Sequence, residues 1–257
     1  MNKLEKAISL TMSEEQYINN TYGDCGSTKS MDEMESMDDT TALTEQEYID
    51  KKIMFQGSSQ GALLNQLRDI RTALNKTKNT NNNLIMITSV EKNSGTSFFS
   101  RNIAAVTSFD SSRSSLLIDC NISNPSVADT FDLKGKNGVL DYIYDSEITE
   151  SEIINPVGIK RFRCVTAGNI KMESEEYFTH PRFRSLLNDL KNRYKNRNIF
   201  IDAPSLLDSA NARILLELCD QVILVAPIGR VGIKKLEAAS KIIPKEKFSG
   251  VVINDYS

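Results

Sequence analysis

The sequence predicts an α/β fold, a doubly wound and mostly parallel sheet with helices on both faces. Three observations support this prediction. Short apolar runs that favour strands alternate along the chain with amphipathic runs that favour helices. Residues 84–104 place an apolar strand directly before a polar turn and a helix. Two of the apolar runs end on an aspartate, Asp119 and Asp202, at the strand ends where parallel sheets collect their ligands.

The turn within residues 84–104 has the layout of a phosphate-binding loop, whose pattern is G-x-x-x-x-G-K-[ST]. Gly95 and Ser97 match the last glycine and the hydroxyl residue that binds magnesium. Val90 stands at the first glycine, and Thr96 stands where the pattern has its lysine. The layout is therefore present, and the side chain that normally grips the phosphates is missing.

The loop keeps donors that do not depend on its side chains. Backbone N–H groups and the dipole at the start of the helix favour an anion. The residues that we expect to bind a nucleotide are Ser94, Gly95, Thr96, Ser97 and Phe98. Loss of one preorganised charge in such a site costs about 3 kcal/mol of transition-state stabilisation. Lys92, in the same turn, is one alternative source of that charge, and a solvated loop lysine is the other interpretation.

The composition narrows the function classes. A chain of 257 residues with 40% hydrophobic content has room for one α/β domain and extensions. A net charge of -3 argues against a non-specific nucleic-acid binder, whose surface would be basic. The sequence lacks both the run of roughly 20 apolar residues that a membrane span needs and a signal-peptide core, so we expect a cytoplasmic protein.

Cysteine and histidine usage argues against several kinds of site. The four cysteines lie far apart and show no C-x-x-C spacing, so neither a zinc knuckle nor a disulfide framework is suggested. Cys120, Cys164 and Cys219 lie in apolar contexts and are expected to be buried. His180 is the single histidine, so we expect no Ser-His-Asp triad or multi-histidine metal site.

The chain divides into two predicted parts. Residues 1–57 are polar and acidic and are expected to be largely disordered, because such a stretch buries little apolar surface. Within them, residues 1–10 form a candidate docking helix with a frayed terminus as the alternative, and residues 44–53 are expected to hold a helical turn or two. Residues 58–257 form the predicted α/β domain.

Periodicity predicts the elements of that domain. Leucine and isoleucine at spacings of four, three and four give an amphipathic helix over 62–74, and Pro181 occupies the first turn of a later helix. The predicted helices are 62–74, 97–109, 127–131, 138–142, 151–154, 181–194, 207–218 and 231–243. The predicted strands are 84–88, 115–119, 162–166, 198–202, 221–226 and 249–253.

The two strand-final aspartates are the predicted catalytic residues. Asp202 ends an apolar run and precedes Ala-Pro, as in a Walker B strand. A lone aspartate in this place is often only a cap or turn former. Asp202 is the second such residue after a phosphate-loop turn, and Asp119 points to the same sheet edge, which favours the functional interpretation.

At this point the sequence resembles a known family. The run Leu117-Ile-Asp-Cys-Asn-Ile-Ser-Asn-Pro-Ser resembles the second Walker motif of the ParA/MinD-type P-loop ATPases. The closest likeness is to the bacterial tyrosine kinases (CpsD/CapB type) of capsule and exopolysaccharide synthesis. The resemblance runs from about Leu63 to Asn254. Its other motifs are Thr166-Ala-Gly, His180-Pro-Arg-Phe-Arg-Ser-Leu-Leu, Ile201-Asp-Ala-Pro-Ser, Asp208-Ser-Ala-Asn-Ala-Arg-Ile-Leu and Gly250-Val-Val-Ile-Asn.

The resemblance implies an ATP site with magnesium. In that family the Ser97 hydroxyl would bind magnesium, and Asp119 and Asp202 would lie near the metal and the attacking group. Asn254 would lie near the adenine. Two residues depart from the family at this site: Asn121 replaces the second aspartate of its motif, and Ser123 replaces an arginine. Together with the missing loop lysine, these departures imply that ATP or ADP and magnesium bind weakly or not at all.

The resemblance also implies oligomerisation through a Glu-x-x-Arg-x-x-Arg helix. This chain has Asn65 in place of the glutamate and keeps Arg68 and Arg71, so a homo-oligomer is expected without its usual ion pair. The family's tyrosine-rich tail is also missing, since only Asp255, Tyr256 and Ser257 follow the last strand.

Three functions follow from these observations. The preferred one is a degenerate kinase, or pseudokinase, that regulates an integral-membrane polysaccharide co-polymerase or chain-length regulator and lies at the inner membrane through that partner. The alternative is an active ATP-dependent tyrosine autokinase with Tyr17, Tyr22 or Tyr48 as acceptor. The third is a ParA/MinD-like positioning ATPase, although neither a basic patch nor a strongly amphipathic tail is evident for it.

Overall fold

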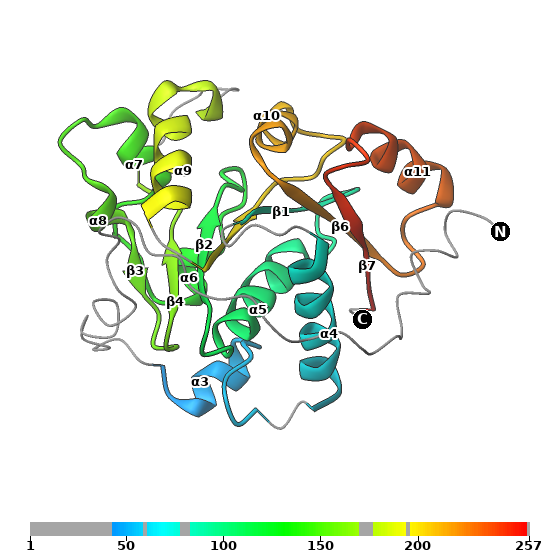
Figure 1. Ribbon diagram of the computed structural model, residues 1–257, viewed down its shortest axis with the longest axis horizontal. Helices are drawn as coiled ribbons and strands as arrows, with labels where there is room; N and C mark the ends of the chain where they lie inside the picture. The colour runs from blue at the N-terminus through cyan, green and yellow to red at the C-terminus, as the bar shows by residue number, and fades with distance from the viewer. Residues whose placement is uncertain (1–42, 59–60, 78–82, 170–176, 194–195, 256–257) are drawn as a thin grey trace, which may run out of the picture.

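A seven-stranded sheet forms the centre of the computed structural model, which describes residues 43–58, 61–77, 83–169, 177–193 and 196–255 (Figure 1). The strands are β1 Asn83–Ser89, β2 Ser114–Asp119, β3 Asn155–Pro156, β4 Phe162–Val165, β5 Arg197–Asp202, β6 Gln221–Pro227 and β7 Phe248–Asn254. Their order is β3-β4-β2-β5-β1-β6-β7. Every neighbouring pair is parallel except β3 with β4, which confirms the predicted doubly wound, mostly parallel sheet.

The six predicted strands are confirmed to within one residue at each end. Every residue of β1, β2 and β5 is buried, which is why these strands read in sequence as almost continuous apolar runs. The short antiparallel β3 was not predicted. It has only two residues, one of them Pro156, and a pair of residues carries no alternating pattern.

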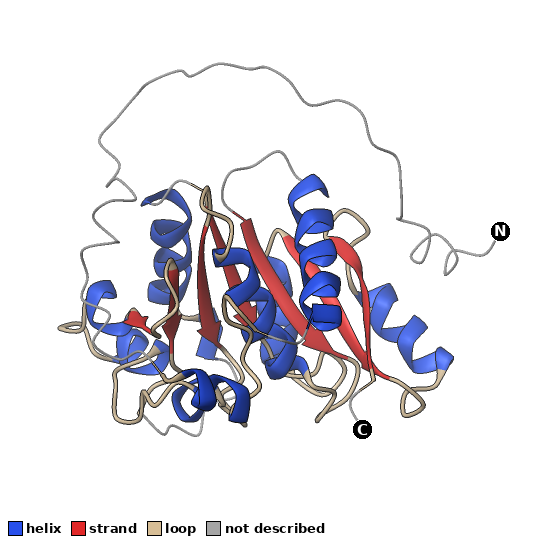
Figure 2. Ribbon diagram, turned by 90° about the horizontal axis from the view of Figure 1, so that it is seen from below, coloured by secondary structure: helices blue, strands red, loops and turns tan. Residues whose placement is uncertain are grey.

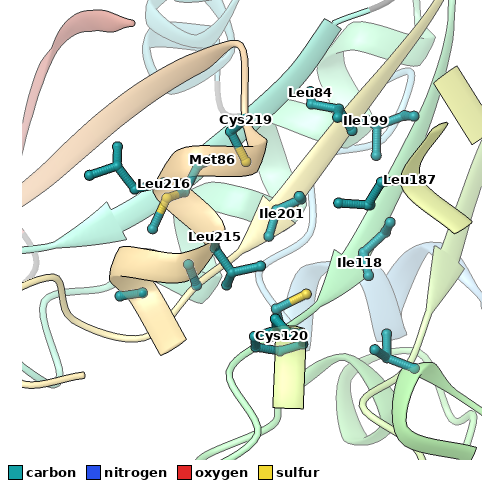
Figure 3. Packing of buried hydrophobic residues seen from close by; sticks show 14 of the residues in the cluster. Leu84, Met86, Ile118, Cys120, Leu187, Ile199, Ile201, Leu215, Leu216 and Cys219 are labelled. Atoms are coloured by element: carbon teal, nitrogen blue, oxygen red, sulfur yellow. The ribbon is translucent and has the colours of Figure 1, made fainter. Parts of the chain in front are cut away.

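Helices cover both faces of the sheet (Figure 2). The helices are α3 Glu45–Asp50, α4 Gly61–Thr77, α5 Thr96–Ser108, α6 Val127–Thr130, α7 Val139–Tyr144, α8 Glu150–Ile153, α9 Pro181–Arg193, α10 Ala210–Leu218 and α11 Ile233–Ile242, with a 3₁₀ helix η1 at Tyr177–Thr179. Helices α3 to α6 pack on one face, and α7 to α11 pack on the other. Figure 3 shows part of the hydrophobic core between the sheet and helices α7 to α11, with Met86 and Ile201 from the sheet and Leu215 from α10.

The helix predicted over 207–218 begins later than expected. Ser209 is the N-cap of α10, and its hydroxyl accepts a hydrogen bond from the Ala212 N–H at 3.4 Å. Residues 205–209 are consequently free to form a loop after β5, and Ser205, Asp208 and Ser209 line the pocket described below.

Part of the predicted N-terminal segment packs on the domain. Helix α3 confirms the turn or two expected within 44–53, and a capping box between Thr44 and Glu47 starts it. The buried Tyr48 donates its hydroxyl to the Val157 carbonyl at 3.1 Å, and the Met54 N–H donates to Asn102 Oδ1 at 2.7 Å. Residues 1–42, with the candidate docking helix, Tyr17 and Tyr22, lie outside the described residues, and the division at residue 57 stays a prediction.

The three cysteines that were expected to be buried, Cys120, Cys164 and Cys219, are buried and form no disulfide. Burial raises the pKa of the Cys219 thiol to about 12, so this thiol is an inert packing group at neutral pH. Among the described residues, every helix is too short or too polar to cross a bilayer.

Candidate nucleotide site

The loop between β1 and α5 is closed by a glycine that no other residue can replace without strain. Gly95 is the N-cap of α5 and has φ 81°, in the left-handed region. A Cβ built on Gly95 would lie 2.1 Å from Asn254 Nδ2. The backbone conformation therefore requires glycine here, as the phosphate-loop pattern predicted, and a larger residue would also displace the Asn254 amide.

Hydrogen bonds within the loop fix its shape. The hydroxyls of Ser89 and Ser94 both donate to the Glu91 carbonyl, at 2.7 and 2.6 Å. Asn254 Nδ2 donates to the Ser94 carbonyl at 3.0 Å from the end of β7. The loop is thereby preorganised, and the first N–H groups of α5 face the anion position that helix geometry creates.

A pocket of about 500 Å³ opens over this loop at the carboxyl ends of β1, β2 and β5. Its lining consists of Ser89, Lys92, Asn93, Ser94, Gly95, Thr96, Ser97, Phe98, Asn121, Ser123, Asn124, Ser126, Ala203, Pro204, Ser205, Asp208 and Ser209. The structure thus brings together all five residues predicted from the loop, along with Asn121 and Ser123. Hydroxyl and amide groups dominate, and within the described part of the chain Lys92 is the one cationic residue of the lining.

The Asp119 carboxylate accepts hydrogen bonds from the backbone of the loop that follows β2. Its Oδ1 accepts from the Asn121 N–H at 3.1 Å, and its Oδ2 accepts from the Ser126 and Val127 N–H groups at 2.8 and 3.0 Å. The side chain is fully buried. Burial raises the pKa of Asp119 to about 6, while the three backbone donors act in the opposite direction.

Asp202 lies beside Asp119, since the two residues are partners in the register of β2 and β5. Its Oδ1 accepts from the Ser100 hydroxyl at 3.1 Å. Burial first, and then the Asp119 charge, raise the pKa of Asp202 to about 7, while hydrogen bonding from Ser97 and Ser100 lowers it. Within the described residues Oδ2 of Asp202 is buried without a hydrogen-bond partner. This oxygen is enclosed in the structure, and neither Asp202 nor Asp119 belongs to the lining of the pocket.

The donor set fits magnesium only together with a nucleotide. The described residues contain no cluster of three or more His, Cys, Asp or Glu side chains that would hold a metal. Magnesium is commonly held by one or two carboxylates plus phosphate oxygens and water. The unpartnered Oδ2 of Asp202 and the nearby Ser97 hydroxyl are the groups that fit such an ion. The ion would neutralise phosphate charge there.

The remaining predicted site residues have other contacts in this structure. Asn254 holds the Ser94 carbonyl of the loop, so its expected place near the adenine stays a prediction. Arg71 donates to the Val106 carbonyl at 3.0 Å inside its own chain, and the exposed Arg68 reaches Asn65 Oδ1 at 3.4 Å. A role for either arginine in oligomerisation also stays a prediction.

Sequence reasoning missed two basic residues that contact the loop from α11 and the turn before it. Lys235 forms an ion pair with Glu91, and Arg230 Nη1 donates to the Asn93 carbonyl at 3.4 Å. These partners are 144 and 137 positions apart in the chain. The spacing of residues along the chain does not indicate such contacts. Asp208 also lines the pocket, and it could have been predicted as a site residue because one of the family motifs begins at this position.

Comparisons with known proteins point to one kind of enzyme. The chain is 26% identical over 213 residues to the tyrosine-protein kinase Wzc of Salmonella typhimurium, a match that covers 80% of this chain and 29% of that relative. It is 26% identical over 179 residues to the tyrosine-protein kinase CpsD of Streptococcus agalactiae, covering 68% of this chain and 75% of the relative. The chain thus spans less than a third of the length of Wzc. No family model matches it.

Solved structures agree on the fold. The kinase domain of the Escherichia coli tyrosine kinase Etk superposes with a TM-score of 0.70 at 23% identity, covering 83% of this chain and 86% of that one. The resemblance predicted from the motifs is confirmed: this chain has the P-loop fold and is similar in sequence to bacterial tyrosine-protein kinases.

Proposed function

We propose that this protein is a degenerate relative of the bacterial tyrosine kinases of capsule and exopolysaccharide synthesis, acting by binding rather than by phosphoryl transfer. The observation that carries the proposal is the combination of a preformed phosphate loop with Thr96 in the position of the lysine. The fold, the shape of the loop and the anion position are kept. The charge that stabilises the transferring phosphoryl group is not supplied from its usual place.

The second aspartate-bearing loop supports the same proposal. Asn121 and Ser123 line the pocket where the family has an aspartate and an arginine. Asp119 is engaged by three N–H groups of its own loop, which leaves Asp202 as the carboxylate with an oxygen to offer. A magnesium ion held by one carboxylate and one hydroxyl would depend on the nucleotide for its other ligands. We therefore expect weak binding of ATP or ADP with magnesium and little turnover.

The proposed role is regulation of a membrane-bound polysaccharide co-polymerase from the cytoplasmic side. This part of the proposal rests on the kind of relatives that the chain has, Wzc and CpsD among them. The chain would reach the membrane through its partner.

An active autokinase is the alternative, favoured by the retained loop and by the free oxygen of Asp202. Its acceptor would not be Tyr48 in this structure, because that side chain is buried and its hydroxyl is bonded to Val157. Phosphorylation there would first require α3 to detach. Tyr17 and Tyr22 remain the acceptors to test.

One experiment separates the two proposals. Purified wild type, Thr96→Lys and Asp202→Ala proteins are compared for binding of labelled ATP with magnesium, for ATP hydrolysis and for phosphotyrosine by mass spectrometry. We expect wild type to show negligible turnover and Thr96→Lys to bind ATP about tenfold more tightly, which is ~1.4 kcal/mol. Magnesium-dependent turnover by wild type that Asp202→Ala abolishes would instead establish the active kinase.

A further inference from the structure

We propose that Lys92 is the cation that contacts the phosphates of a bound nucleotide in this protein, in place of a lysine at position 96. The inference deepens the proposed function and rests on it, because it concerns how the same pocket holds a nucleotide. It assigns to this side chain a role that the phosphate-loop pattern places four residues further along the chain.

The first support is the composition of the pocket. Seventeen residues line it, and Lys92 is the single cation among them within the described chain. Thr96, at the usual lysine position, is nearly buried and offers only a hydroxyl. A nucleoside triphosphate in this pocket would lie beside the Asp208 carboxylate of the lining. An anion seated there needs a compensating charge, and Lys92 is the side chain placed to supply it.

The second support is the way in which the neighbours of Lys92 are held. Glu91 on one side pairs with Lys235 of α11, and the Glu91 carbonyl accepts both serine hydroxyls of the loop. Asn93 on the other side has its carbonyl bound by Arg230. Lys92 thus lies between two residues that are bound by α11 and the turn before it, and its own exposed side chain lines the pocket.

The third support concerns charge. Glu91 is the nearest carboxylate in sequence, and it would be the natural partner of a neighbouring lysine. Its carboxylate is instead held by Lys235, and Glu91 does not belong to the lining. The ion pair with α11 therefore leaves the Lys92 charge available to a ligand. A lysine ammonium on its flexible four-carbon stem is well suited to this use, since it acts on phosphate as a point charge.

The test measures MgATP binding by isothermal titration calorimetry and fluorescent-nucleotide displacement for the full chain and four variants. The variants are Lys92→Ala, Lys92→Arg, Lys234→Ala and the double variant Lys92→Ala with Thr96→Lys. Lys234 is exposed on α11, close in sequence to the residue that holds Glu91, and does not line the pocket, so its removal matches the loss of net charge. Circular dichroism and thermal melts check that each variant is folded.

We expect Lys92→Ala to weaken MgATP binding at least tenfold and to flatten its dependence on salt. Lys92→Arg should stay within threefold of wild type, and Lys234→Ala should be unchanged. The double variant should regain the affinity lost by Lys92→Ala, because the charge returns from the usual position.

Equal affinities for Lys92→Ala and Lys234→Ala would overturn the inference and leave the proposed function standing. The inference about Lys92 would also be overturned if the wild-type protein bound no nucleotide even at millimolar concentration. A regulatory role of the protein would then be independent of nucleotide. Wild-type turnover would contradict the proposed function without touching the role of Lys92, since binding is measured separately.

Discussion

The ends of β2 and β5 carry the same residue in the same register and use it differently. Asp119 is surrounded by N–H groups of its own following loop, which satisfy both of its oxygens. Asp202 receives one hydroxyl on Oδ1 and has an Oδ2 without a partner among the described residues. A strand-final aspartate is therefore structural or available for chemistry according to how the chain turns after it. The comparison shows that Asp119 anchors its loop, and it supports the proposal that Asp202 binds a ligand.

The largest expected effect tests the anchor. Asp119→Ala leaves three backbone N–H groups in a buried site without an acceptor, and we expect unfolding to become easier by about 3–5 kcal/mol. Urea unfolding measures the loss. Asp119→Asn, which keeps one carbonyl oxygen, is the matched control and should lose clearly less. An Asp119→Ala protein as stable as wild type would mean that the loop after β2 does not depend on this carboxylate.

Asp202→Asn should act in the opposite direction on stability. The native pKa of about 7 means that ionising this buried carboxylate is unfavourable, so at pH 8 the neutral amide should raise the free energy of unfolding by roughly 1–3 kcal/mol. Binding of MgATP should fall in the same variant. Thermal melts at pH 8 and titration calorimetry check the two effects. A destabilised Asp202→Asn protein would contradict the idea that Asp202 is kept for binding.

The pH dependence of stability sharpens the same contrast. Both aspartates have a native pKa above the ordinary value of 3.8, so between pH 4 and 7 the native state holds more protons than the unfolded chain. Their contribution to the free energy of unfolding should therefore be largest below pH 4 and decline as pH rises to about 7. The difference between wild type and Asp202→Asn, followed by urea unfolding from pH 5 to 8, should grow with pH. A constant difference would be inconsistent with the raised pKa of Asp202.

The smallest effect concerns the Ser100 hydroxyl, which donates to Oδ1 of Asp202. Ser100→Ala removes one hydrogen bond to the carboxylate, which should raise the pKa of Asp202 further and change the stability at pH 8 by about 1 kcal/mol. Carboxyl chemical shifts from NMR titration report the pKa. Ser108→Ala, which removes a buried hydroxyl on the same helix that donates to the Ala105 carbonyl, is the control and should leave that titration unchanged.

The sequence predicts the positions of these groups better than their surroundings. Strand ends at Asp119 and Asp202 follow from apolar runs, and the parallel order brings them together, because such a sheet aligns its carboxyl ends. Their different environments depend on backbone donors from residues up to eight positions away, which periodicity does not encode. The same reason hides the contacts of Lys235 and Arg230 with the loop, since they join segments more than 130 positions apart.

The inward turn of Arg71 is another feature that spacing alone does not reveal. Arginines three positions apart predict a charged helix face. The spacing does not show whether that face contacts a second copy of the chain or another helix of the same chain. Here the guanidinium of Arg71 reaches the Val106 carbonyl of α5. Helices α4 and α5 run side by side in Figure 1, and this contact ties them together.

The side-chain amide of Asn254 connects the edge strand β7 to the loop that follows the central strand β1. Asn254 Nδ2 donates to the Ser94 carbonyl, and β7 is an outermost strand of the described sheet, so displacing this strand would remove a hydrogen bond that holds the turn beneath the anion position. This hydrogen bond connects the outermost strand directly to the pocket. A molecule bound at this edge of the sheet would therefore act on the loop through Asn254, without rearranging the hydrophobic core.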